Sequence, residues 1–347
     1  MRHGRETSAM TLDVLGVGNA IVDVFAEHDA ALAEQFGLEH GTMNLVDDAT
    51  STALTTWAGW SRGASGGSVA NTTVGVVSLG GSAGFVGRVA PDAVGDLFTE
   101  DLRRTGVAFQ PYRRSSSREP AELVTGRCLV LVGPDGERTM ATYLGAANLI
   151  EPEDLEPAQF AAAKVVYLEG YLSDAPFGHE VLRLASNLAA EHGAALALSL
   201  SDPFCVERHR ELFLELAGRA DLVFCNSDEA QLLTGEQELE GCLAALSELP
   251  GTAVVTRGAN GAHVLSEAGQ VHVPAQIVER VVDTTGAGDL YAAGFLYGYT
   301  HGRDLVSCAR LGAVAAGEIV SQLGARPLRP LAERQTDAEL ISTTKGR

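Results

Sequence analysis

The sequence predicts an α/β fold: an αβα sandwich with a mainly parallel central sheet, plus a small β-rich lid. Three observations predict it. Short apolar runs alternate with segments of helical period, the pattern of a parallel sheet covered by helices. Two regions interrupt this alternation with isolated strand-like pieces. Glycine is abundant, at 39 of 347 residues, which favours tight turns over a helical bundle.

Apolar runs of four to six residues are typical of buried strands, and segments of period 3.6 are typical of helices. We expect strands at 14–17, 165–168, 195–200, 222–225 and 253–256. We expect helices at 176–191, 208–216, 228–234 and 239–249, and two more after Gly286 and Arg303. Strand and helix at this spacing predict parallel βαβ units.

The two irregular regions predict the lid. We expect residues 12–20, 61–108 and 148–335 to form the large αβα domain, and residues 21–60 and 109–147 to form the lid. Strand-like pieces lie at 42–46 and 128–132, and Pro-Asp-Gly at 134–136 is a turn signal. The alternative is ordinary decoration of the sheet edge. Residues 1–11 and 336–347 are predicted to be flexible tails.

The charge and cysteine content exclude several partners. A net charge of −20 and a pI of about 4.8 disfavour binding to nucleic acid and to anionic membranes. Five cysteines show no CxxC pairing, which indicates reduced packing residues of a cytoplasmic protein. The polar first residues lack the apolar core of a signal peptide. We therefore expect a small-molecule partner.

Lysine is nearly absent, which excludes the familiar phosphate clamps. The two lysines, Lys164 and Lys345, lie outside any G-x-x-x-x-G-K-[ST] segment or protein-kinase pattern. A G-x-G segment at 16–18 lacks the third glycine of a dinucleotide site. Phosphate chemistry in this chain would therefore rely on backbone amides, arginine and a metal ion.

The segment Asp-Thr-Thr-Gly-Ala-Gly-Asp at 283–289 precedes an apolar helix. Gly286, Ala287 and Gly288 would converge backbone N–H groups at the positive helix terminus, which makes an anion hole. Asp289 would lie beside that hole, where a carboxylate can accept the proton of an attacking hydroxyl. The bland alternative is a glycine-rich helix start.

This segment resembles the C-terminal signature of the PfkB, or ribokinase-like, family of carbohydrate and nucleoside kinases. Ser-Gly-Gly-Ser-Val-Ala-Asn at 65–71 resembles the N-terminal signature, and the resemblance extends over 12–328. It implies the fold described above and ATP-dependent, in-line phosphorylation of a hydroxyl, with Asp289 as the base and 286–288 as the anion hole.

The resemblance also implies a substrate side. Asp23 would bind two neighbouring hydroxyls, since a carboxylate accepts two parallel O–H donors. Arg138 in the lid would point toward the transferring phosphate, although a surface arginine of a hairpin is the alternative. Ser68 suits the N-cap of the following helix. The substrate contacts implied are Asn19, Asp23, Gly66, Gly67 and Asn71.

On the nucleotide side, Asn-Ser-Asp-Glu at 226–229 resembles the family's N-x-x-E motif. It implies that Asn226 and Glu229 position Mg²⁺ through water, although an N-capped helix start explains the same residues. Asp283 would contribute to a monovalent-cation site, such as one for K⁺. The ATP contacts implied by the resemblance are Asn226, Thr256, Arg257, Gly258, Gly261, Ala313 and Gly317.

Within the family, Ser-Leu-Ser-Asp-Pro-Phe at 199–204 resembles the adenosine-kinase-like members. Tyr171 and Phe204 would offer aromatic faces to a purine ring, with core packing as the alternative. Thr285 departs from the Asn of some adenosine kinases. The substrate is expected to be a purine nucleoside phosphorylated at its 5′-hydroxyl. A sugar or sugar-acid kinase is the alternative, and the protein is expected to be a monomer or a homodimer through the lid.

Overall fold

The computed structural model describes residues 11–27, 30–40, 42–59, 63–111, 123–133, 138–341 and 344–345. Residues 1–10 of the predicted tail at 1–11 and the predicted turn at 134–136 lie outside these residues. Among the residues described, no helix is both long and apolar enough to cross a membrane.

The larger sheet contains ten strands within the described residues. It is parallel from β6 to β12 and antiparallel from β12 to β15. Its strands, in spatial order, are β15 (Thr344–Lys345), β14 (Gly269–Val273), β13 (Ala262–Ser266), β12 (Thr252–Thr256), β11 (Leu222–Asn226), β10 (Ala195–Ser199), β9 (Ala163–Glu169), β1 (Leu12–Val17), β5 (Ala83–Val86) and β6 (Ala108–Phe109).

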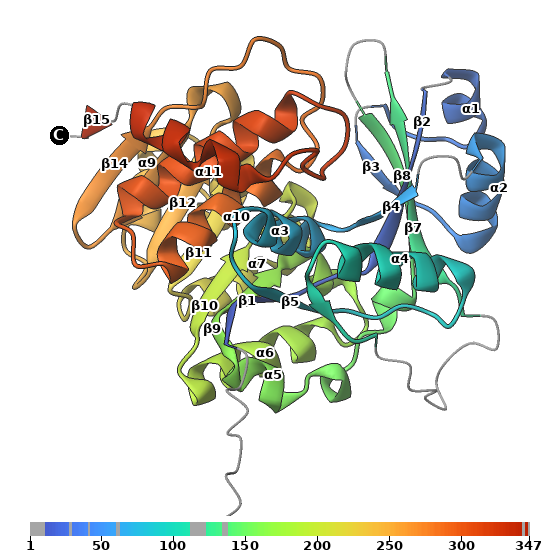
Figure 1. The fold of residues 1–347 in the computed structure, drawn as a ribbon, viewed down its shortest axis with the longest axis horizontal. Helices are drawn as coiled ribbons and strands as arrows, with labels where there is room; N and C mark the ends of the chain where they lie inside the picture. Colours follow the sequence, from blue (N-terminus) through green and yellow to red (C-terminus); the bar gives the residue numbers. More distant parts are fainter. Residues whose placement is uncertain are drawn as a thin grey trace, which may run out of the picture.

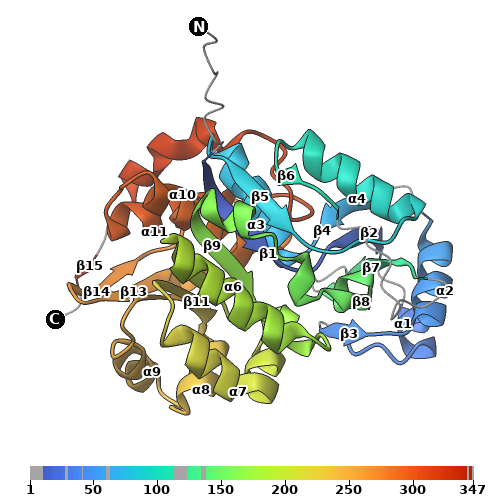
Figure 2. The same cartoon turned by 90° about the horizontal axis from the view of Figure 1, so that it is seen from below.

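Helices cover both faces of this sheet, as Figures 1 and 2 show. Two separate apolar clusters, one on each face, form the core. One face carries α3 (Ser68–Ser78), α4 (Ala93–Arg104), α10 (Ala287–Thr300) and α11 (Leu305–Val320). The other carries α5 (Pro157–Ala161), α6 (Gly178–His192), α7 (Pro203–Ala217), α8 (Ser227–Thr234) and α9 (Leu239–Leu246). The predicted α/β fold is confirmed.

A second sheet lies beside the first, at one side of the molecule (Figure 1). Its two faces differ because side chains alternate along a strand. On β7, Leu129 and Leu131 pack under the outer helices, whereas Cys128 and Val130 belong to a separate inner cluster. The elements are β3 (Met43–Leu45), β8 (Arg138–Gly145), β7 (Thr125–Val132), β2 (Ile21–Glu27) and β4 (Gly63–Gly66), with helices α1 (Ala30–Gln35) and α2 (Asp48–Ala58).

Three features differ from the sequence-based expectation. The region 21–60 contains α2, which Asp47 caps by accepting a hydrogen bond from the Thr50 amide. Strand β4 belongs to the second sheet, because it pairs with β2, whereas the sequence predicts 61–108 in the large domain. The C-terminal residues are not simply a tail: a 3₁₀ helix, η5 (Leu331–Leu340), is followed by β15, which pairs with β14.

The order of the parallel strands creates a place for a ligand. Within this sheet, the next strand in sequence after β1 is β5, which lies on one side of β1, and the later strands from β9 to β12 lie on the other. Ligands of open α/β sheets bind outside the carboxyl ends of the strands at such a reversal of strand order. The four short 3₁₀ helices that complete the fold are η1 (Ala146–Leu149), η2 (Pro152–Asp154), η3 (Gly170–Asp174) and η4 (Gly258–Asn260).

Candidate active site

A cavity of about 370 Å³ lies at the carboxyl ends of the parallel strands, where the inner face of the second sheet forms its opposite wall. Its lining includes the chain after β1, the ends of β9 to β12, and the N-termini of α3 and α10. It brings together these residues implied above: Asn19, Asp23, Gly67, Asn71, Tyr171, Asn226, Glu229, Thr256, Gly286, Ala287, Gly288 and Asp289.

Asp289, in the first turn of α10, is held by the N-terminus of α3. Its Oδ1 accepts a hydrogen bond from the Ser68 hydroxyl at 2.7 Å, and its Oδ2 accepts one from the Asn71 amide at 2.8 Å. Burial raises the pKa of the Asp289 carboxyl above its ordinary value, against the opposing effect of these two hydrogen bonds. The carboxylate is thus oriented at the cavity wall.

The expectation that Ser68 is a helix cap is wrong. Gly67 occupies the N-cap position of α3 and makes no side-chain cap hydrogen bond. The Ser68 hydroxyl donates to Asp289, 221 positions away. A hydroxyl at a helix start can bond either to a backbone amide of its own helix or to a neighbouring side chain. The packing of α10 against α3 brings Asp289 within reach, so the hydroxyl bonds to Asp289.

The N-terminus of α10 has the form of an anion hole. The first N–H groups of a helix have no intrahelical acceptor, and the helix dipole adds partial positive charge there. Gly286 has φ +74°, and a Cβ on it would lie 2.6 Å from the Cβ of Ala325. A Cβ on Gly288 would meet nothing within 4 Å. The backbone conformation and the close contact with Ala325 therefore require glycine at 286. At 288 the absence of a side chain leaves open space beside the helix start.

Close backbone packing surrounds Asp23 and Asn19. A Cβ on Gly66 would lie 2.3 Å from the Asp23 carboxyl carbon, and a Cβ on Gly67 would lie 2.3 Å from the Asn19 carbonyl oxygen. The Oδ1 atom of Asn71 is buried and has no hydrogen-bond partner within the described chain. This acceptor, at the cavity wall, suits a hydroxyl of a ligand.

Glu169, at the end of β9, lines the cavity but is not among the site residues predicted from the sequence. It is fully buried, and its carboxylate accepts hydrogen bonds from the backbone amides of Asn19 and Val69, at 2.9 and 3.0 Å. Burial, with repulsion from Asp289, raises its pKa to about 7. A charged residue ending an apolar strand just before a glycine is the signal that could have identified it.

Arg326 is a second missed residue. Its guanidinium donates to the carbonyl oxygens of Ser65, at 2.6 and 2.9 Å, and Ala70, at 2.8 Å. Desolvation lowers its pKa to about 10, although nearby carboxylates that include Asp23 and Asp289 oppose the shift. It stays charged at neutral pH and balances those carboxylates. Its loop has no periodic pattern that marks it in sequence.

Asn226 and Glu229 face the cavity and form a reciprocal helix cap on α8. The Asn226 side-chain oxygen accepts from the Glu229 amide at 2.9 Å, and the Glu229 carboxylate accepts from the Asn226 backbone and side-chain amides, at 3.0 and 2.7 Å. Burial raises the pKa of Glu229 to about 7. Asn226 and Glu229 therefore cap α8, and both residues also line the cavity.

Asp283 ties two loops together. It is buried, and its carboxylate accepts the backbone amides of Thr285, at 2.8 Å, and Gly324, at 2.6 Å. It thereby fixes the turn that leads into α10. The monovalent-cation site stays a prediction.

The two predicted aromatic faces differ in position. Tyr171, in η3, is partly buried and lines the cavity. Phe204 does not line it: its side chain is 56% exposed at the start of α7. Asp202 caps this helix and Pro203 begins it, so Phe204 lies in its first turn.

The other residues predicted to contact ATP are not among those that line the cavity. Gly258 and Gly261 shape the turn between β12 and β13, where the Arg257 amide donates to the Gly261 carbonyl at 2.7 Å. Ala313 and Gly317 lie on α11. Arg138 is the first residue of β8, and its side chain is outside the described part. Their roles stay predictions.

Three known proteins are similar to this chain over nearly its whole length. A probable sugar kinase from Rhizobium etli CFN 42 is 43% identical, with a TM-score of 0.88, over 96% of this chain and 100% of that one. An adenosine kinase from Sinorhizobium meliloti is 44% identical, with a TM-score of 0.87, over 94% and 99%. Adenosine kinase 1 from Arabidopsis thaliana is 27% identical, over 90% and 94%.

Residues 61–331 match the model of the pfkB family carbohydrate kinases. This span contains both motifs on which the sequence resemblance rests, the one at 65–71 and the one at 283–289. It also contains Asp289 and its two hydrogen-bond donors. The chain therefore belongs to the pfkB family of carbohydrate kinases, and it is a phosphotransferase.

Proposed function

We propose that the protein transfers the γ-phosphoryl group of ATP to the 5′-hydroxyl of a purine nucleoside such as adenosine. The observation that carries the proposal is the orientation of Asp289 by Ser68 and Asn71 beside the N-terminus of α10. Asp289 accepts the proton of the attacking hydroxyl. The amides of 286–288 offset the charge that develops on the transferring phosphoryl group.

Asp23 and Asn71 bind the sugar in this proposal. The Asp23 carboxylate suits a pair of neighbouring hydroxyls, and the buried Oδ1 of Asn71 accepts a third. Membership of a kinase family implies ATP and Mg²⁺. Asn226 and Glu229 fit Mg²⁺ held through water, because oxygen donors with retained waters are what this ion prefers. When bound, Mg²⁺ would neutralise phosphate charge.

The inner face of the second sheet favours a substrate with an apolar part. Opposite Asp289 the cavity is lined by Ile21, Met43, Cys128, Met140 and Leu144. A free sugar carries hydroxyls all around, and pressing these on an apolar wall would cost hydrogen bonds to water. A purine ring buries its faces there instead. The 44% identical adenosine kinase supports the same choice.

A free sugar or sugar acid is the second candidate, since a probable sugar kinase is 43% identical. A coupled assay of ADP release over nucleosides and sugars decides between them. We expect turnover of adenosine, and Asp289→Asn should lower kcat by about 10²–10⁴ while ligands still raise the melting temperature. Asp96→Asn, also in the first turn of a helix, is the matched control.

Two outcomes would contradict the proposal separately. Turnover of a sugar without turnover of any nucleoside would remove the nucleoside assignment. Unchanged kcat in Asp289→Asn would remove the base role of Asp289 whichever substrate is used.

A further inference from the structure

Two neighbouring turns form part of the cavity wall. One is η3, which follows β9, and the other joins β10 to α7. Tyr171 and Asp174 from the first turn and Ser201 from the second line the cavity. The phosphoryl transfer proposed for Asp289 involves no residue of either turn. The hydrogen bonds and the backbone strain in these turns therefore point to another role.

Ser201 has a left-handed backbone, with φ +72°, and it is the single non-glycine residue with positive φ among those described. The Asp202 amide donates to the Leu200 carbonyl at 2.9 Å, which closes a three-residue turn of the rare, strained type. Such strain persists only where the surroundings enforce it, and it gathers at functional sites.

The strained conformation gives the Ser201 hydroxyl a specific partner. Its Oγ accepts a hydrogen bond from the Gly170 amide at 2.8 Å. A Cβ on Gly170 would lie 2.4 Å from the Leu200 carbonyl oxygen, so the two turns pack backbone to backbone. The position of the residue that follows Gly170, which is Tyr171, therefore depends on the turn at Ser201.

Asp174 anchors the other end of η3. Its carboxylate accepts two hydrogen bonds from Arg208, one of them from Nε at 3.0 Å, and lies 2.7 Å from Nε2 of His209. Both partners belong to α7, whose backbone departs from helical geometry at His209. The His209 ring in turn lies 3.0 Å from Nε2 of His179 on α6. Tyr171 thus sits between two tethers to the β10–α7 segment.

We propose that Ser201 and Asp174 are positioning residues: they hold Tyr171 in the cavity wall, and so select substrates that carry a planar ring. This inference rests on the proposed nucleoside kinase activity. Aromatic side chains stack on bases of any kind, so a fixed tyrosine ring favours nucleosides over free sugars.

Steady-state kinetics test the proposal. Ser201→Ala and Asp174→Asn should each raise KM for adenosine by about tenfold, the effect expected when a base–aromatic stack is loosened. The kcat and the KM for ATP should stay unchanged. Ser173→Ala is the matched control in the same turn, because the Ser173 hydroxyl is buried without a hydrogen-bond partner in the described structure. Its KM should equal that of the wild type.

A double-mutant cycle separates positioning from a general loss of structure. In a Tyr171→Ala background, Ser201→Ala should have no further effect on the KM for adenosine. A further tenfold rise in that background would overturn the proposal. So would a fall in kcat together with a rise in the KM for ATP. Ser201→Gly should be more stable than Ser201→Ala, because glycine adopts positive φ without strain.

A crystal structure of Ser201→Ala gives a readout that needs no nucleoside activity. Displacement of Tyr171 from the cavity wall is the expected result, and an unmoved Tyr171 would overturn the positioning role. Failure of the wild type to phosphorylate any nucleoside would instead overturn the proposed function. The two failures are therefore distinguishable.

Discussion

At the residue scale, the carboxyl of Glu169 couples the site to pH. Its folded-state pKa of about 7 lies above its ordinary value of 4.5, because burial disfavours the charged form and Asp289 repels it. Between these two pH values the folded protein retains a proton that the unfolded chain has lost. Folding stability from this group is therefore full below pH 4.5 and falls as the pH rises to about 7.

We predict that this pH dependence is lost in Glu169→Gln. The wild type should lose roughly 3 kcal/mol of unfolding free energy to this group between pH 4.5 and 8, and the variant should not. Urea unfolding of both proteins across this range measures the difference, in which the contribution of Glu229 cancels. The exposed Glu180→Gln is the control. A difference between wild type and Glu169→Gln that is constant with pH would contradict the assignment.

At the element scale, two glycines at the N-terminus of α10 allow effects on stability and on activity to be tested separately. Its two glycines are alike in sequence, but only Gly286 has a positive φ and a crowded Cβ position. Gly288 has an ordinary helical place with open space in front of it. Substitution by alanine should therefore destabilise the fold at Gly286 but not at Gly288.

Gly288→Ala should keep or raise the unfolding free energy, by up to about 1 kcal/mol, since alanine favours the helix. Its methyl group would occupy the space offered to the phosphoryl group, so kcat should fall at least about tenfold. Gly286→Ala should lose stability and activity together. Thermal unfolding and the ADP-release assay check both variants, and wild-type activity in Gly288→Ala would contradict the anion-hole role of 286–288.

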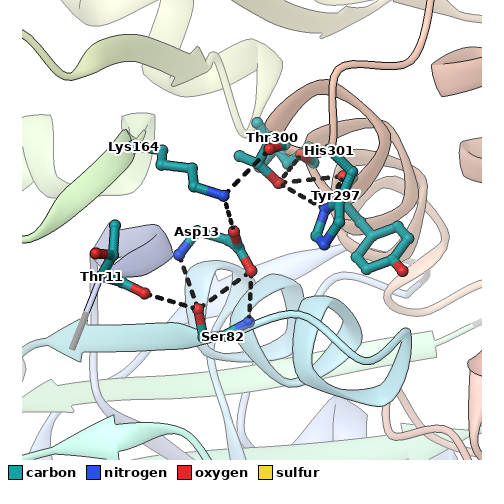
Figure 3. A network of polar contacts seen from close by, with 8 residues as sticks. Thr11, Asp13, Ser82, Lys164, Tyr297, Thr300 and His301 are labelled. Atoms are coloured by element: carbon teal, nitrogen blue, oxygen red, sulfur yellow. Dashed lines mark hydrogen bonds and ion pairs between the residues drawn. The ribbon is translucent and has the colours of Figure 1, made fainter. Parts of the chain in front are cut away.

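At the scale of the whole molecule, Figure 3 shows a polar network around Asp13 and Lys164. These residues lie near the amino ends of β1 and β9, whereas the cavity lies at the carboxyl ends of the strands. Lys164 on β9 donates to Asp13 on β1 at 2.8 Å and to the carbonyl of Thr300, at the end of α10, at 3.3 Å. Asp13 also accepts from the amide of Ser82 at 2.8 Å. The network joins two central strands to the C-terminal end of α10, where a cation also complements the helix dipole.

Lys164→Met should lower the unfolding free energy by about 1–2 kcal/mol, because the largely buried Asp13 loses its charged partner. The kcat should not change, since the site lies at the other end of α10. Arg104→Met, which breaks an exposed pair with Glu100, is the control and should cost at most about 0.5 kcal/mol. A large fall in kcat at wild-type stability would contradict this division of roles.

Several strands and the start of α10 could be predicted from the sequence, because they depend on residues that are close together in the chain. Apolar runs predicted β1, β9, β10, β11 and β12 because a strand buried on both faces is apolar throughout. The start of α10 was readable because a glycine-rich turn before a helix depends on neighbouring residues alone. Predicted helix starts were less exact: α7 begins at Pro203, earlier than 208, because the Asp202 cap lies outside the apolar period.

Other features depended on contacts between distant segments. The partner of Ser68 is 221 positions away, the Glu169 carboxylate binds amides 100 and 150 positions away, and Arg326 binds a carbonyl 261 positions away. The exposure of Phe204 and the strain at Ser201 also followed from packing. Short-range patterns in the sequence identify the family, the parallel sheet and the glycine-rich turn before α10. How the carboxylates are held and which aromatic ring faces the cavity depend on tertiary contacts, because burial and hydrogen bonding across the sheet set both.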